Sequence, residues 1–297
     1  MKGDQGPLPL AGSCGSYYDR MLHEPGAHDG REVPVRGNTW GRGVRIASKA
    51  ATKIINGGSF GKEKGGIHGT CFRVRDKGRI RAIVFDFDGT LAELHLDFSR
   101  MKREVDALAV ELLPDAEMLP LRVLEWLEVL RAEVARRAPH RLAEFVRRAD
   151  DIIHDMEIDA ARRGALFPFT RPMLEGLQRQ GVKAAVITRN CEAAVRLVFP
   201  DVDRYCTVLL ARGHVPKVKP DPDHLLRALE MMECGPEGAL MVGDHPLDVE
   251  TGKRAGVLTA GVSSGRVSSD ELSRSGADWV AADCQGLMQQ LGLFGAE

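Results

Sequence analysis

The sequence predicts an α/β fold with a parallel sheet at its core and an inserted helical subdomain. Two observations carry this prediction. Short, nearly continuous apolar runs alternate with helical patterns over the last two thirds of the chain, and one long stretch of purely helical patterns interrupts that alternation after the first run. The chain has 297 residues, of which 43% are hydrophobic, so it can bury a core of this kind.

Four apolar runs are the expected strands. They lie at 80–85, 182–187, 239–242 and 257–262, and are rich in Val, Ile, Leu and Ala. Continuous apolar character is typical of strands that are covered by helices on both faces, as in a parallel sheet with right-handed crossovers. Three helical patterns lie between or beside these runs, at 171–180, 222–232 and 248–255.

The interrupting stretch, residues 95–166, carries three amphipathic stripes and no convincing strand. Apolar side chains recur there every three or four residues, as at Met101, Val105 and Leu108. We expect three helices that pack against one another. The sequence therefore predicts a helical subdomain inserted between the first and second strands of the sheet.

Residues 1–78 differ in composition from the rest of the chain. They contain 13 Lys and Arg against 7 Asp and Glu, and half of the 32 glycines. Such a segment buries little apolar surface, so we expect a disordered or weakly ordered extension, or a start codon assigned too far upstream. A basic arm for nucleic acid is disfavoured, because aromatic side chains do not alternate with the basic ones.

Charge and cysteine usage exclude several classes of protein. The formal net charge is −1, and none of the six cysteines has CxxC spacing, so we expect reduced thiols in a cytoplasmic protein. No apolar run approaches the roughly 18 residues that a membrane span needs. The N-terminus also lacks the pattern of a secretory signal.

Two carboxylates end the first predicted strand, in Asp86-Phe87-Asp88-Gly89-Thr90. Alternation along an extended chain places Asp86 and Asp88 on the same side, and the carboxyl ends of such strands face the ligand crevice. Two acids at this edge repel each other and lose hydration. This arrangement is unfavourable unless the acids bind a cation or take part in phosphate chemistry. An ordinary Asp-Gly turn explains only one of them.

The stretch 85–91, Phe-Asp-Phe-Asp-Gly-Thr-Leu, resembles the first motif of the haloacid dehalogenase superfamily. Three further motifs follow in that family's order. Thr188 comes after the second predicted strand, Lys219 begins Lys-Pro-Asp-Pro, and the stretch 243–248 (Gly-Asp-His-Pro-Leu-Asp) follows the third strand. The resemblance covers about residues 80–290, and the size and position of the insert resemble the C1-capped, phosphoglycolate-phosphatase-like branch.

This resemblance implies a domain organisation. Residues 79–94 and 167–297 would form a Rossmann-like α/β core, and residues 95–166 a helical cap over its active site. The cap of such an enzyme closes over the crevice and excludes water.

The resemblance also implies catalytic roles. Asp86 would attack phosphorus and form an aspartyl-phosphate, and Asp88 would protonate the leaving group and then activate water. Thr188 and Lys219 would bind and neutralise the phosphoryl group. Lys217 competes with Lys219 for that role, and the Lys-Pro-Asp-Pro run favours Lys219. Arg189 and Asn190 are candidate substrate-binding residues, although many relatives carry Asn-Lys at these positions.

Mg²⁺ is the cofactor that the resemblance implies, because it is a hard cation that prefers oxygen ligands. Its expected ligands are the carboxylates of Asp86 and Asp244 and the backbone carbonyl of Asp88. Asp248 is expected to hold a metal-bound water or to orient a ligand.

The predicted function is a Mg²⁺-dependent phosphatase that acts on a small phosphorylated metabolite, with neither a membrane nor a nucleic acid as partner. The acid at position 88 disfavours carbon–halogen hydrolysis, which has no phosphate leaving group to protonate. A phosphomutase on the same fold and a non-catalytic binding protein on this scaffold remain alternatives. The sequence leaves the oligomeric state open.

Overall fold

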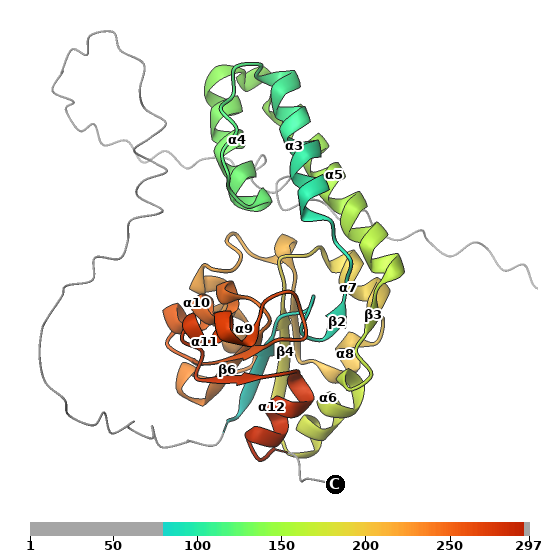
Figure 1. Cartoon of the computed structure of the whole chain (residues 1–297), viewed down its shortest axis with the longest axis vertical. Helices are drawn as coiled ribbons and strands as arrows, with labels where there is room; N and C mark the ends of the chain where they lie inside the picture. Colours follow the sequence, from blue (N-terminus) through green and yellow to red (C-terminus); the bar gives the residue numbers. More distant parts are fainter. Residues whose placement is uncertain (1–79, 294–297) are drawn as a thin grey trace, which may run out of the picture. The chain divides into compact units, whose positions relative to one another are not determined.

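A computed structural model describes residues 80–293, so the prediction for the extension 1–78 lies outside the described residues. Its centre is a six-stranded, entirely parallel sheet with the strand order β5-β4-β1-β6-β7-β8. Figure 1 shows this sheet with helices packed around it. The strands are β1 (Ala82–Phe85), β4 (Lys183–Ile187), β5 (Val208–Leu210), β6 (Ala239–Gly243), β7 (Leu258–Val262) and β8 (Trp279–Ala281).

Helices cover both faces of this sheet. Ile83 and Phe85 of β1 pack into one hydrophobic cluster with α6 (Thr170–Arg179) and α12 (Cys284–Gln290), whereas Ala82 and Val84 pack into another with α9 (Pro222–Met231). Alternate side chains of one strand thus reach opposite layers. The other helices that follow β4 are α7 (Glu192–Val198), α8 (Val202–Tyr205), α10 (Pro246–Ala255), α11 (Ser269–Arg274) and the 3₁₀ turns Arg212–His214 and Pro236–Gly238.

The chain leaves the sheet after β1 and returns before α6. The two connections form a short antiparallel pair, β2 (Ala92–Glu93) with β3 (Ala165–Leu166). Between them lie α3 (Phe98–Leu112), α4 (Val123–Arg137), the 3₁₀ turn Pro139–Arg141 and α5 (Leu142–Arg163), which we call the helical insert.

The helical insert has its own hydrophobic core. Trp126 of α4 is almost fully buried in it with side chains of α3 and α5, among them Val105 and Phe145. The Trp126 indole N–H donates to Asp106 Oδ1 at 2.8 Å, so its one polar group is satisfied. The three predicted stripes are therefore three mutually packed helices, as expected.

The predicted α/β fold is confirmed, with differences at its margins. β1 begins at Ala82 rather than at residue 80, and β5 and β8 were not predicted. These two strands lie at the edges of the sheet and have three residues each, too few to show a pattern. The expectation of no strand within 95–166 is wrong at β3, where two residues pair with β2 without any periodic signal.

Two further predictions concern the whole chain. Within residues 80–293 the four cysteines form no disulfide with one another, and the expected reduced state stays a prediction. Among the helices of this part of the chain, none combines the length and the apolar character that a membrane crossing requires.

Candidate active site

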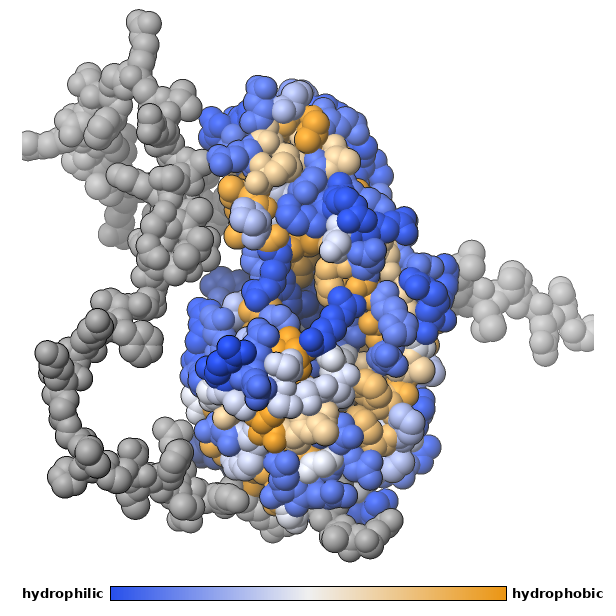
Figure 2. Space-filling view, in the orientation of Figure 1, coloured by the Kyte–Doolittle hydropathy of each residue, from blue (hydrophilic) through white to orange (hydrophobic). Residues whose placement is uncertain are grey.

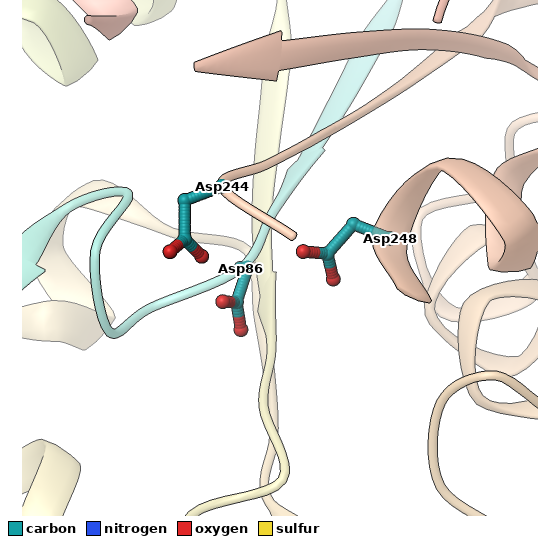
Figure 3. Close-up of side chains that lie close together, drawn as sticks. All are labelled: Asp86, Asp244 and Asp248. Atoms are coloured by element: carbon teal, nitrogen blue, oxygen red, sulfur yellow. The ribbon is translucent and has the colours of Figure 1, made fainter. Parts of the chain in front are cut away.

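Three acidic side chains meet at the carboxyl edge of the sheet. Asp86 follows β1 and Asp244 follows β6, which are neighbouring parallel strands, while Asp248 lies in the first turn of α10. Their carboxylates converge, with one oxygen of each lying within 4.8 Å of the others (Figure 3). Asp86 thus lies next to two acids that come 158 and 162 residues later in the chain, because β1 and β6 are neighbours in the sheet.

Lys219 lies beside these acids and is 2% exposed. Its ammonium group donates to Asp86 Oδ1 at 2.6 Å and to Asp248 Oδ1 at 2.7 Å. Burial lowers the pKa of Lys219, but the two carboxylates raise it by more, so the amine stays protonated. Lys217, the competing candidate, is exposed and pairs with Asp221 instead.

The acids carry more negative charge than Lys219 neutralises. Burial, followed by the charge of Asp86, raises the pKa of Asp244 to about 8. Burial also raises the pKa of Asp248 to about 6, although Lys219 opposes this shift. Clustered buried carboxylates are stable in the ionised form only with a further cation. The donor set, all carboxylate oxygen, fits Mg²⁺.

Two glycines make room for the Asp244 carboxylate. Gly89 has φ of +82°, a left-handed conformation that favours glycine, and a Cβ there would lie 2.6 Å from Asp244 Cγ. A Cβ on Gly265 would also overlap this carboxylate. The glycine of the Asp-x-Asp-Gly motif therefore serves both the turn and the space that Asp244 needs.

Asp88 faces the same cavity but its carboxylate is separate from the three-acid cluster. Its Oδ1 accepts the backbone N–H of Leu94 at 3.0 Å. Burial, and next the charge of Asp86, raise the pKa of Asp88 to about 7. Such a carboxyl group can both give and take a proton near neutral pH.

Thr188 and Asn190 follow β4 on the other side of β1 and also line the cavity. Thr188 Oγ1 accepts the backbone N–H of Asn190 at 3.1 Å, so its hydroxyl proton remains free to donate. Asn190 Oδ1 accepts the N–H of Cys191, which fixes the side-chain amide.

Arg189 is held by the helical insert. Its guanidinium forms a bidentate ion pair with Glu125 of α4, at 2.7 and 2.9 Å, and also donates to the carbonyl of Lys219. The candidate substrate-binding role of Arg189 therefore remains a prediction. In this structure its side chain links α4 to the loop 188–191 between β4 and α7, which we call the phosphate-side loop. Sequence reasoning missed Glu125, which is half-buried in the structure, since an acid in the first turn of a helix gives no signal of a distant partner.

A second insert carboxylate, Glu157 of α5, was also missed. It is 3% exposed, accepts the N–H of Cys191 at 3.0 Å and forms an ion pair with Arg212. Arg212 in turn donates to the carbonyl of Arg189 at 2.9 Å. A sequence signal existed here, because Glu157 lies four residues after Ile153 and so continues the apolar stripe of α5.

The candidate catalytic residues open into a cavity of about 810 Å³. The carboxyl edge of the sheet forms its floor, and α3, α4 and the loop before α4 contribute the opposite wall. The space-filling view shows this hollow between the helical insert and the sheet-containing part (Figure 2). All eight predicted site residues line it, namely Asp86, Asp88, Thr188, Arg189, Asn190, Lys219, Asp244 and Asp248.

Known proteins resemble this chain in sequence and in fold. A pyrophosphatase PpaX of Bacillus cereus is 27% identical over 62% of this chain and 84% of its own length. A phosphoglycolate phosphatase of Shigella dysenteriae is 27% identical over 72% of this chain and 93% of its own length. The crystal structure of a haloacid dehalogenase-like hydrolase of Bacteroides fragilis has the same fold, with a TM-score of 0.52 at 24% identity over 70% of this chain and 100% of its own.

Residues 83–262 match the sequence profile of the haloacid dehalogenase-like hydrolases. This range begins within β1, includes the whole helical insert and ends with β7. It holds all four motifs from which the resemblance was drawn, so the predicted family is confirmed. The chain belongs to the haloacid dehalogenase-like hydrolase family.

Proposed function

We propose that this protein is a Mg²⁺-dependent phosphatase that hydrolyses a phosphate ester through an aspartyl-phosphate on Asp86. The observation that carries the proposal is the convergence of Asp86, Asp244 and Asp248 around Lys219 at the floor of a cavity. Relatives named as phosphatase and pyrophosphatase support phosphorus as the centre attacked.

Asp86 is the proposed nucleophile because one of its oxygens is free and a positive charge lies beside the other. Lys219 binds Oδ1, and among residues 80–293 no group donates to Oδ2. In the first step an oxygen of Asp86 attacks phosphorus, the bond from phosphorus to the leaving oxygen breaks, and Asp88 gives that oxygen its proton. The pKa of Asp88, about 7, suits this transfer.

In the second step a water molecule attacks the aspartyl-phosphate and gives its proton to Asp88. The bond between phosphorus and Asp86 then breaks, which restores both carboxyl groups and releases phosphate. Thr188 donates its hydroxyl proton to a phosphoryl oxygen, and Lys219 adds positive charge beside the attacked centre.

Asp86, Asp244 and Asp248 are the side chains that would hold Mg²⁺, together with the backbone carbonyl of Asp88. When bound, the ion supplies charge stabilisation for the phosphoryl group. We further propose that residues 95–166 act as a cap that keeps bulk water from the cavity, and that the protein works in the cytoplasm.

The decisive experiment is phosphate release from a panel of phosphate esters and pyrophosphate, with Mg²⁺ and with a chelator in its place. We expect turnover of at least one compound with Mg²⁺ and its loss with the chelator. Release that the chelator leaves unchanged would contradict the metal assignment. Recovery of the phosphoryl group on an organic product would identify a phosphomutase instead.

A further inference from the structure

We propose that the substrate is an amphipathic phosphate ester, whose leaving group has an apolar body and a second negative charge recognised by Arg103 and Arg122. The inference rests on the proposed phosphatase function and narrows its substrate class. Three features of the cavity above the catalytic floor carry it: its volume, its apolar wall and its two arginines.

The volume exceeds what a small phosphorylated acid needs. A cavity of about 810 Å³ lies in the range that holds drug-sized ligands. The phosphoryl group occupies only the floor, beside Asp86 and Lys219, so most of the space is left for the leaving group.

The wall around that space is mainly apolar. Most of the exposed cavity surface belongs to apolar atoms, and Phe98, Leu121 and Leu124 of the helical insert contribute to it. Phe98 is 48% exposed, and the guanidinium of Arg266 lies 4.9 Å from the centre of its ring. Hydrophobic surface is visible inside the hollow of Figure 2. An apolar leaving group would remove this surface from water.

Arg103 of α3 and Arg122 before α4 line the same cavity. Both side chains are exposed, and neither forms a hydrogen bond or ion pair with any residue in 80–293, although the charge of Arg122 acts on the nearby Glu125. Among the other cations of the cavity, Arg189 pairs with Glu125 and Lys102 with Asp106. Arg266 has no carboxylate partner but donates to the carbonyl of Leu96 and lies over the ring of Phe98. A guanidinium that faces a ligand cavity without a carboxylate partner is suited to bind a carboxylate or phosphate in a bidentate manner.

The test uses four probes with Mg²⁺: phenyl phosphate, 4-carboxyphenyl phosphate, 1,4-phenylene bisphosphate and phosphoglycolate. We expect the wild type to favour the two charged aryl esters in kcat/KM. In the double variant Arg103→Gln/Arg122→Gln, this preference over phenyl phosphate should fall by about tenfold or more, the worth of a charge-assisted hydrogen bond. The matched control is Arg147→Gln, at an exposed residue of α5 outside the cavity.

The outcomes are distinguishable. An unchanged preference in the double variant overturns the anion-binding role, and a wild-type preference for phosphoglycolate over the aryl esters overturns the apolar body. Either result leaves the phosphatase proposal standing. No release from any phosphate ester would overturn both. The carboxylated and phosphorylated aryl esters identify which anion the arginines recognise.

A different observation carries a second inference: we infer that Glu157 is a positioning residue for the phosphate-side loop. Its buried carboxylate holds the N–H of Cys191 and the guanidinium of Arg212, and Arg212 holds the carbonyl of Arg189. These contacts fix the backbone on both sides of Asn190, whose N–H is bonded to Thr188 Oγ1.

The consequence is that an insert helix sets the geometry of a core loop. α5 packs closely on α7, which begins immediately after this loop. Loss of the Glu157 charge would leave Arg212 buried without its counter-ion and free the loop to shift. Because a misplaced Thr188 weakens binding of the transferring phosphoryl group, the main effect falls on kcat.

Glu157→Gln tests this, and Arg212→Lys serves if the first variant fails to fold. We expect kcat about tenfold lower with a smaller change in KM, measured below the melting temperature of each variant. The control is Asp201→Asn, which breaks the bidentate pair with Arg171 outside the cavity and should leave kcat unchanged. A normal kcat in a folded Glu157→Gln or Arg212→Lys variant would refute the positioning role.

Discussion

Asp86→Asn is expected to lower phosphate release by at least about a thousandfold while the protein stays folded. Asparagine keeps the size of the side chain but is a far poorer nucleophile than a carboxylate. The substitution also removes one member of the three-acid cluster that would hold Mg²⁺. The measurement is single-turnover phosphate release at saturating Mg²⁺ with the best ester of the panel.

The same variant should keep or gain stability when no metal is present. The charge of Asp86 is, after burial, the largest cause of the raised pKa of Asp244, so its removal relieves repulsion at a buried site. Lys219 retains its contact with Asp248. We expect the melting temperature in chelator to equal or exceed that of the wild type. Phosphate release by Asp86→Asn at nearly the wild-type rate would exclude Asp86 as the nucleophile.

The floor of the site was predictable from the sequence because its residues lie at the ends of strands. Asp86 and Asp244 each follow an apolar run that can only be a buried strand, and parallel strands bring their carboxyl ends to one edge. Lys219 could be named only through the family motif. Its position in a loop gives no periodic signal, and Lys217 is chemically identical.

The ion pairs between the helical insert and the core were not predictable in this way. Glu125 and Arg189 are 64 residues apart, and Glu157 and Arg212 are 55 residues apart. Such pairs depend on how α4 and α5 approach the loop after β4, which no local pattern encodes. Of these four residues, only Glu157 gave a signal in the sequence, because it is a charged residue on the buried stripe of a helix.

The residues of the cavity wall were likewise not predictable from local sequence patterns. Arg103 lies on a predicted amphipathic helix, where an arginine is usually solvated surface. In the structure Arg103 is exposed, as such a position predicts, and it also lines the cavity together with Arg122. The family resemblance predicts the chemistry on the floor, whereas no motif of the sequence points to the arginines of the wall, and their role in substrate selection is our proposal.

Lys219→Met is expected to lower both stability and activity strongly. The ammonium is the buried counter-ion of Asp86 and Asp248, and methionine has a similar length without charge or donor. Breaking a buried ion pair by removing one partner costs about 3–5 kcal/mol, because the other charge is left uncompensated. Chemical denaturation in chelator measures this loss, and phosphate release measures the loss of charge at the attacked centre.

A second substitution separates these two effects. In Lys219→Met/Asp248→Asn one of the uncompensated carboxylates is also removed, so the free energy of unfolding should recover relative to Lys219→Met. Activity should not recover, since the positive charge beside Asp86 is still missing. Recovery of both would mean that Lys219 only stabilises the fold. Recovery of stability alone, with activity far below that of the single variant Asp248→Asn, would show that this lysine acts on the phosphoryl group as well as on its neighbouring acids.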